Sequence, residues 1–191
     1  MTVDRLAEFS IGFILANEEF ARGTGKMKHV TGRSLSVRAL QPQDRDWVDR
    51  TLASAWGSVV VARKAELLDA STFPGYAAVR DGDRVGLAIF CVRGDEYEVL
   101  SLSSAIEGKG VGRILMQHCI EDARSRGCRR VWLTTTNNNI RAIAFYQRLG
   151  MNLCAFYRDG VEASRRLKPS IPLRDEFGIA IDHELEFELL L

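Results

Sequence analysis

The sequence predicts an α/β fold of the α+β kind, built on one mixed central β-sheet. The first observation is a meander: three strand-like runs between residues 75 and 104 are separated by the turn sequences "DGD" at 81–83 and "RGDE" at 93–96. The second is that helical spacing then alternates with strand-like runs from Val111 onward. That order predicts a parallel pair of strands joined by a crossover helix.

Two kinds of element are expected ahead of the meander. Residues 34–40, "SLSVRAL", alternate apolar and polar side chains and predict a strand. Residues 41–56 have the apolar spacing of a helix, with Pro42 near its start. Residues 63–71, "RKAELLDAS", predict another short helix.

The first residues of the chain predict a separate extension. Apolar residues share one helical face over 4–21, which predicts an amphipathic helix, and 22–34 predicts a loop. Met27 within that loop leaves two interpretations open: an extension that the fold does not need, or a helix that packs on the core or on a partner chain. We expect residues 1–34 to form this extension and residues 35–191 to form one domain.

The segments after the meander follow in a clear order. The helix that begins at Val111 has apolar residues at i, i+3, i+4 and i+8 and ends at Gly127. The elements expected after it are a strand over 128–136, a helix over 140–150, a strand within 151–160, a short helix over 161–167 and a final strand over 183–191. Residues 159–191 therefore form a C-terminal helix, a loop and a strand with one buried face and one acidic face.

Composition excludes several classes of function. The chain has 191 residues and a formal net charge of +1, so bulk charge gives no reason to expect nucleic-acid binding. No run approaches the length of a membrane span. The four cysteines form no C-x-x-C pair and predict reduced core thiols in a cytoplasmic protein, and the three histidines have no metal-site spacing.

The segment "EGKGVG" at 107–112 lies between a predicted strand and a predicted helix. It lacks the Gly-Lys-Ser/Thr of a phosphate-binding loop of the Walker type, and it does not complete the dinucleotide pattern G-x-G-x-x-G. A glycine-rich turn at a helix N-terminus directs free backbone N–H groups at an anion, and a pyrophosphate fits such a site. From the glycines alone, a tight turn without a ligand is an equal alternative.

A second segment, "NNNIRAIAFYQRLGM" at 137–151, carries Asn139, Ala142 and Tyr146 at spacings of three and four. With the segment at 107–112, it resembles the signature of the GNAT superfamily of acyl-CoA-dependent N-acetyltransferases. That signature is Gln or Arg, then x-x-G-x-G or A, followed about thirty residues later by N-x-x-A-x-x-x-Y and a trailing glycine. Both motifs occur here in order and with the right spacing.

The resemblance implies the GNAT fold over about residues 35–158, with helices on both faces of the sheet. The strand before the glycine loop should splay from the strand carrying "VWLTT", and the pantetheine arm of acetyl-CoA should insert between them. The residues that the resemblance assigns to acetyl-CoA are Leu100, Ser101, Leu102, Glu107, Gly108, Lys109, Gly110, Val111, Gly112, Arg113, Asn139 and Ala142. The departure is Glu107, whose side chain we expect to point away from the pyrophosphate while Lys109 and Arg113 supply positive charge.

The resemblance also assigns catalytic roles. Tyr146 matches the family's general acid, which protonates the thiolate of CoA; its alternative interpretation is a core aromatic. Glu98, just upstream of the bulging strand, is the candidate that takes the proton of the attacking amine. An ion-paired strand glutamate, with a chain of water molecules as the proton acceptor, is the alternative for Glu98.

The function expected from the sequence is an N-acetyltransferase that uses acetyl-CoA and no metal. The alternative is a GNAT-fold module that holds acyl-CoA as a sensor or scaffold without turnover. A toxin that acetylates aminoacyl-tRNA is disfavoured because the chain has no basic excess. The acceptor is a small-molecule or peptide amine that the sequence does not identify, and the expected partners include neither nucleic acid nor a membrane; a homodimer is compatible with the sequence.

Overall fold

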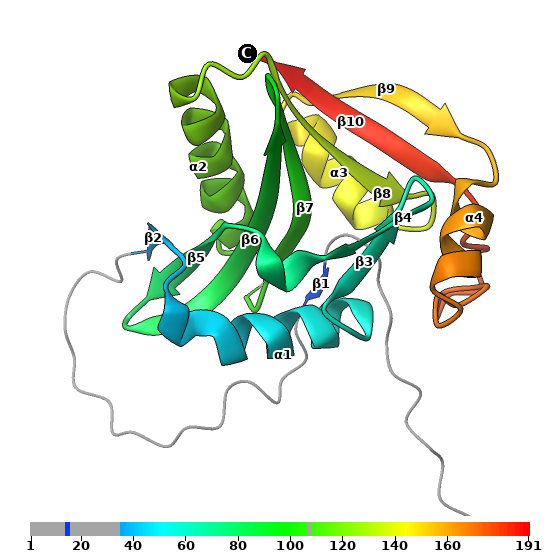
Figure 1. The fold of residues 1–191 in the computed structure, drawn as a ribbon, viewed down its shortest axis with the longest axis horizontal. Helices are drawn as coiled ribbons and strands as arrows, with labels where there is room; N and C mark the ends of the chain where they lie inside the picture. The colour runs from blue at the N-terminus through cyan, green and yellow to red at the C-terminus, as the bar shows by residue number, and fades with distance from the viewer. Residues whose placement is uncertain (1–13, 16–34, 107) are drawn as a thin grey trace, which may run out of the picture.

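The computed structural model describes residues 14–15, 35–106 and 108–191 (Figure 1). Its main sheet has eight strands in the order β2-β5-β6-β7-β8-β10-β9, with β1 paired to β7. Those strands are β1 (Ile14–Leu15), β2 (Leu35–Ala39), β5 (Gly75–Arg80), β6 (Asp83–Arg93), β7 (Glu96–Ser104), β8 (Arg130–Thr136), β9 (Asn152–Tyr157) and β10 (Glu184–Leu190). A separate hairpin consists of β3 (Val60–Arg63) and β4 (Glu66–Asp69). The helices are α1 (Arg45–Trp56), α2 (Val111–Ser125), α3 (Ile140–Arg148) and α4 (Gly160–Leu167).

The predicted meander and the predicted parallel pair are both confirmed. β2, β5, β6 and β7 pair antiparallel in sequence, and the tight turns between β5 and β7 lie at the two predicted turn sequences. β7 and β8 pair in parallel, joined by α2. Strands that alternate apolar and polar residues around two-residue turns pair locally, whereas a parallel pair needs a crossover helix of this length.

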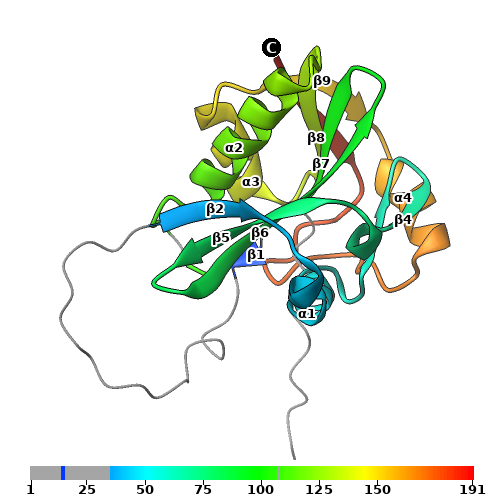
Figure 2. The same ribbon diagram turned by 60° about the vertical axis from the view of Figure 1, so that its left-hand side comes forward.

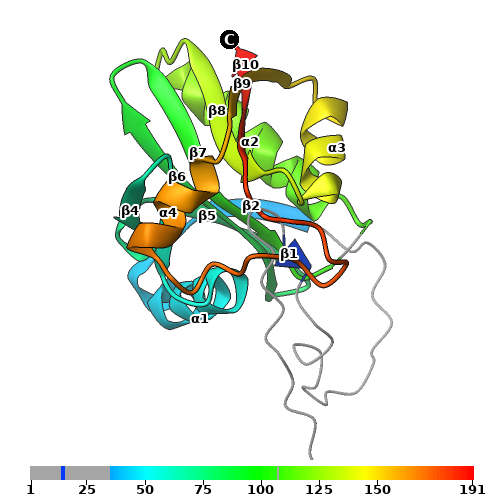
Figure 3. The same cartoon turned by 90° about the vertical axis from the view of Figure 1, so that its right-hand side faces the viewer.

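Helices cover both faces of the sheet, as expected (Figure 2). One apolar cluster joins α2 and α3 to the sheet, and a second joins α1 to the opposite face. Gly86 on β6 lets α2 approach closely, because a Cβ at this position would lie 2.4 Å from Cγ1 of Val111. α4 packs against the β3–β4 hairpin, and Figure 3 shows both on the side of the sheet opposite α3. No helix in the described part of the chain has the length and apolar character of a membrane span.

The prediction of a short helix over residues 63–71 is wrong. Those residues form the turn and second strand of the β3–β4 hairpin, followed by a single 3-10 turn at Ala70–Thr72. Lys64 and Ala65 have positive φ values of 47° and 57°, which lie outside the range of a right-handed α-helix. Partners far away in the sequence hold the hairpin: Arg63 binds Glu98 and the backbone N–H of Lys64 donates to Glu184. Tertiary contacts therefore override the local helical preference.

The helix predicted over residues 4–21 lies outside the described residues except at Ile14–Leu15. These two residues form β1, which pairs in parallel with Ser103 and Ser104 of β7. β6 already pairs with the other edge of β7 at the same two residues, so β1 takes the edge that faces β8. The division into an extension and one domain stays a prediction.

Two expectations about burial need correction. β10 lies between β8 and β9, antiparallel to both, and Phe187 is fully buried as the alternation predicted. The acidic face of β10 is not solvated, because Glu184 and Glu186 are only 2% and 4% exposed beneath the hairpin and α4. Cys154 lies exposed on the outer strand β9, whereas the other three cysteines are buried as expected.

Candidate active site

The glycine turn delivers free backbone N–H groups at the start of α2. Gly108 and Gly110 have φ values of 64° and 80°, and Gly110 is the N-cap residue. A Cβ would meet no atom within 4 Å at either glycine, so crowding does not require glycine at these positions. The positive φ values are what favour glycine there. The first helical hydrogen bond runs from Ile114 N–H to the carbonyl of Gly110, which leaves the preceding amides of α2 available to an anion.

Positive side chains flank this turn. Lys109 and Arg113 are exposed, and Val111 and Gly112 are buried at the base of α2. Glu107 lies outside the described residues, so the expected orientation of its side chain stays a prediction. The turn therefore combines a helix N-terminus, two conformationally required glycines and two cations, which is an arrangement suited to a pyrophosphate.

The sheet opens next to this turn. β7 and β8 pair only from Glu96–Glu98 to Arg130–Trp132, and the rest of the two strands diverges. The predicted splay is therefore present. Beyond Glu98, the edge of β7 that faces β8 has backbone groups available for an extended ligand, as far as the point where β1 pairs with Ser103.

A β-bulge marks the centre of the opening. The register of β6 against β7 shifts so that Phe90 opposes Val99 and Ile89 opposes Ser101, which leaves Leu100 as the extra residue. Leu100 packs in the cluster with α1, and the hydroxyl of Ser101 accepts a hydrogen bond of 3.0 Å from the indole N–H of Trp56. The bulge thus re-aims the backbone of β7 at the point where the strands separate.

α3 brings the second motif to the opposite side of the opening. The side-chain oxygen of Asn139 accepts a hydrogen bond of 3.3 Å from the N–H of Ala142 and caps the helix. Ala142 is fully buried and Tyr146 is 2% exposed. Burial raises the pKa of Tyr146 well above its usual range, so its hydroxyl stays protonated at neutral pH and is able to donate. No side chain in the described ranges accepts a hydrogen bond from that hydroxyl.

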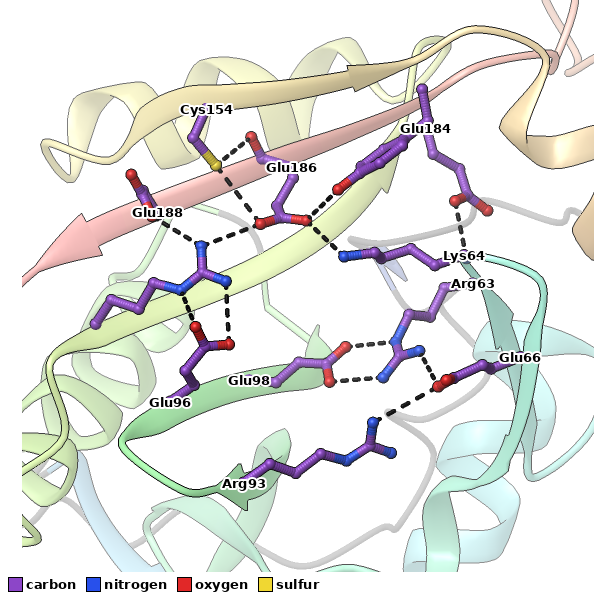
Figure 4. A network of polar contacts seen from close by, with 12 residues as sticks. Arg63, Lys64, Glu66, Arg93, Glu96, Glu98, Cys154, Glu184, Glu186 and Glu188 are labelled. Atoms are coloured by element: carbon purple, nitrogen blue, oxygen red, sulfur yellow. Dashed lines mark hydrogen bonds and ion pairs between the residues drawn. The ribbon is translucent and has the colours of Figure 1, made fainter.

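A pocket lies on the α1 side of the same opening, lined by Trp56, Val61, Ala62, Arg63, Glu98, Val99, Leu100, Thr134, Thr135, Thr136 and Glu184. Glu98 binds Arg63 through both oxygens, at 2.5 Å to Nε and 2.6 Å to Nη2 (Figure 4). Burial raises the pKa of Glu98, against the opposing effect of Arg63. The pKa of Arg63 is also raised: burial lowers it, but the bonds to Glu98 and Glu66 outweigh that effect.

The structure thus places the glycine turn, the open edge of β7 and the second motif around one gap in the sheet, with Glu107 outside the described residues. The α2 and α3 face holds the glycine turn and Tyr146, and the α1 face holds Glu98. Sequence reasoning missed Arg63, Thr134 and Glu184, which complete the pocket on the α1 face. The alternation in 183–191 was the available signal for Glu184, but it does not say what covers a strand face.

Comparisons with known proteins identify the family of this chain. The model of the "Acetyltransferase (GNAT) family" matches residues 41–151. The Bacillus subtilis (strain 168) protein YdhI is 39% identical over 140 residues, which cover 73% of this chain and 88% of that protein. A streptothricin acetyltransferase of Streptomyces lavendulae is 36% identical over 95 residues, which cover 48% of this chain and 49% of that protein.

Solved structures share the fold. A putative streptothricin acetyltransferase from Bacillus anthracis, solved in complex with acetyl coenzyme A, aligns with a TM-score of 0.61 and 15% identity. The alignment covers 83% of this chain and all of the other. At this identity the likeness supports the fold alone.

Proposed function

The chain belongs to the acetyltransferase (GNAT) family, and on that basis we propose that it transfers an acetyl group from acetyl-CoA to a primary amine by direct attack. The single observation that carries the proposal is the gap between β7 and β8, bordered on one face by the glycine turn and Tyr146 and on the other by a polar pocket. Such a gap lets two substrates meet through the sheet. Acetyl-CoA supplies the acetyl thioester, whose carbonyl carbon the amine attacks.

The residues on the α2 and α3 face of the sheet would bind and orient acetyl-CoA. The free amides at the start of α2 would hold the pyrophosphate, with Lys109 and Arg113 adding charge. Main-chain groups of Leu100, Ser101 and Leu102 would pair with the pantetheine arm along the open edge of β7. One amide of that strand would donate to the thioester oxygen and so favour attack at the carbon.

Tyr146 would give its proton to the sulfur as the C–S bond breaks. A thiol has a pKa of about 8.5, so it leaves more readily with a donor beside it. Glu98 would take the proton of the amine, directly or through a chain of water molecules, because each of its oxygens accepts one hydrogen bond from Arg63 and keeps a second lone pair. The proposal includes no metal and no nucleic acid, and it places the protein in the cytoplasm, where its cysteines would be reduced.

The experiment is a thiol-release assay with acetyl-CoA across a panel of amines, followed by Tyr146→Phe on an amine that turns over. General acids contribute about 10²–10⁴-fold, so kcat should fall by that factor while the affinity for acetyl-CoA stays nearly unchanged. Phe145→Leu changes a neighbouring aromatic on α3 and serves as the control for packing. A Tyr146→Phe enzyme with kcat within about threefold of wild type would exclude Tyr146 as the essential donor. Stabilisation by CoA without turnover of any amine would favour the sensor.

A further inference from the structure

Glu184 is a buried carboxylate that has no cationic partner among the residues that the structure describes. It is 2% exposed at the start of β10, and its two oxygens accept hydrogen bonds from Ser164 Oγ at 2.7 Å and from the backbone N–H of Lys64 at 2.8 Å. Neither donor is charged, and no Lys or Arg side chain in the described ranges forms an ion pair with it. A carboxylate that is removed from water without a counter-charge is unfavourable, so its retention at this position needs a reason.

The neighbouring acids are different. Glu186, next along the same face of β10, binds Lys64 Nζ at 2.9 Å and Arg130 Nη1 at 3.1 Å. Glu98 is matched by Arg63. Figure 4 shows these ion pairs side by side, and it shows the hydrogen bond that joins Glu184 to the backbone of Lys64 in the hairpin turn. The surrounding network therefore pairs its other buried carboxylates and leaves Glu184 unmatched.

Glu184 also lines the pocket that reaches the gap in the sheet. In that pocket the charges of Arg63 and Glu98 cancel, so Glu184 gives the lining a net charge of −1. Thr134 lines the same pocket, on the same face of the sheet as Glu184, because its cross-strand partner is Glu186. Its hydroxyl oxygen is buried without a hydrogen-bond partner in the described part of the chain. An unpaired buried hydroxyl indicates a polar ligand, and the unmatched negative charge of Glu184 indicates that this ligand is a cation.

The pocket is also small. Its cavity volume is about 20 Å³, which is roughly the space of one water-sized group. A primary ammonium group has that size, carries one positive charge and has three N–H donors for a carboxylate and hydroxyl oxygens. Leu100, the bulged residue at the opening, lines the pocket too, so a group held there would lie beside the gap.

We infer that Glu184 is the binding residue for the acceptor amine, which enters the pocket as an alkylammonium ion and gives one proton to water or Glu98 before its neutral nitrogen attacks the thioester. The inference rests on the proposed function, because it identifies the pocket as the acceptor side. It names the substrate class as primary alkylamines that are cationic at neutral pH, with Thr134 as a further contact. Neutral isosteres such as alcohols would not be bound.

The alternative is that Glu184 only ties the hairpin turn to α4. Glu184→Gln separates the two roles, because the amide oxygen can accept from Lys64 N–H while the amide nitrogen donates to Ser164 Oγ. The variant keeps both structural hydrogen bonds and removes the charge. Glu188→Gln is the matched control: it makes the same change on the same strand and face, outside the pocket, at a residue paired with Arg130 at 2.8 Å.

The test is titration of the protein with n-butylamine and with n-butanol, followed by calorimetry and thermal shift, with and without CoA. We expect wild type and Glu188→Gln to bind butylamine and not butanol. Glu184→Gln should bind butylamine at least about tenfold more weakly than wild type does. Equal butylamine affinity in Glu184→Gln and wild type would overturn the inference, as would a wild type that does not prefer the amine to the alcohol. Failure of CoA to bind would instead count against the proposed function, since the amine titration without CoA is read separately.

Discussion

Arg63→Met removes the cation that forms an ion pair with Glu98 in the described part of the chain, while a long apolar side chain stays in place. Arg63 and Glu98 are 7% and 3% exposed, and two hydrogen bonds of 2.5 and 2.6 Å join them. Loss of one partner from such a pair leaves a buried charge uncompensated, which costs about 3–5 kcal/mol of the free energy of unfolding. The second ion pair of Arg63, to the half-exposed Glu66, adds about 0–1 kcal/mol. In a domain of this size, about 3–5 kcal/mol corresponds to a fall in Tm of roughly 6–20 °C.

The destabilisation should depend on pH, and the direction follows from Glu98. Burial already raises the pKa of Glu98 in the folded protein, and Arg63 opposes that shift. Without Arg63 the folded-state pKa rises further, whereas the pKa in the unfolded chain stays near 4.3. A raised carboxyl pKa costs nothing below the unfolded value and costs progressively more as pH rises toward the folded value. The variant should therefore lose more stability at pH 8 than at pH 5.

Urea unfolding at pH 5 and pH 8 measures this, with wild type, Arg63→Met, Glu98→Met and the double variant as one cycle. The double variant should recover most of the loss, because an apolar pair no longer contains an unmatched charge. A loss in Arg63→Met under about 1 kcal/mol, or the same loss at both pH values, would refute the assignment of a buried, mutually dependent pair.

Three further predictions concern the coenzyme site, the extension and the core. Gly110→Glu should abolish stabilisation by CoA and should lower the free energy of unfolding by about 1–2 kcal/mol, because the new side chain would sit at a positive φ. Gly82→Glu is the control, since Gly82 is equally open with a φ of 90°, and it should leave CoA binding intact. A CoA-dependent thermal shift in Gly110→Glu would exclude the glycine turn as the binding site. Residues 27–191 should fold and bind CoA at least as tightly as the full chain, because β1 then no longer pairs with β7; an insoluble or weaker-binding product contradicts this. Asp44→Asn should cost about 1.5–3 kcal/mol at pH 7, because Arg38 first and then the Gln41 N–H and Arg84 lower the pKa of Asp44. The stability that ionised Asp44 contributes is present above its unfolded pKa of about 3.9 and is lost as pH falls through its lowered folded pKa. Urea unfolding curves of wild type and Asp44→Asn should therefore converge in acid. Curves that stay apart would count against the ion pair.

The elements that carry the proposed coenzyme side of the site could be predicted because their signals are local. Gly110 follows a strand and opens a helix, and Asn139 and Tyr146 lie at helical spacing, so short windows of sequence contain the whole pattern. The meander has the same property, since its turns are encoded in two or three residues. The splay of β7 from β8 came from the family resemblance alone, because no residue pattern in either strand encodes where pairing stops.

The proposed acceptor side could not be predicted in the same way. Arg63 and Glu98 are 35 residues apart and meet only because 63–71 forms a hairpin, which the local helical preference concealed. Glu184 was placed correctly on the acidic face of the last strand. Alternation identifies the residues that share a face, but the covering of that face by the hairpin and α4 is a tertiary property.

The two sides of the site therefore have different origins in the chain. The family model ends at residue 151, so it contains the glycine turn and Tyr146 but not α4 or β10. Glu184 and Ser164 both lie beyond that limit, and the hairpin turn that donates to Glu184 is held by ion pairs to β7 and β10. Changes in these later segments should therefore alter the charge and depth of the proposed acceptor pocket without moving the glycine turn. We expect relatives that share the motifs of 107–112 and 137–151 to differ in acceptor according to what stands at Glu184 and in the hairpin that covers it.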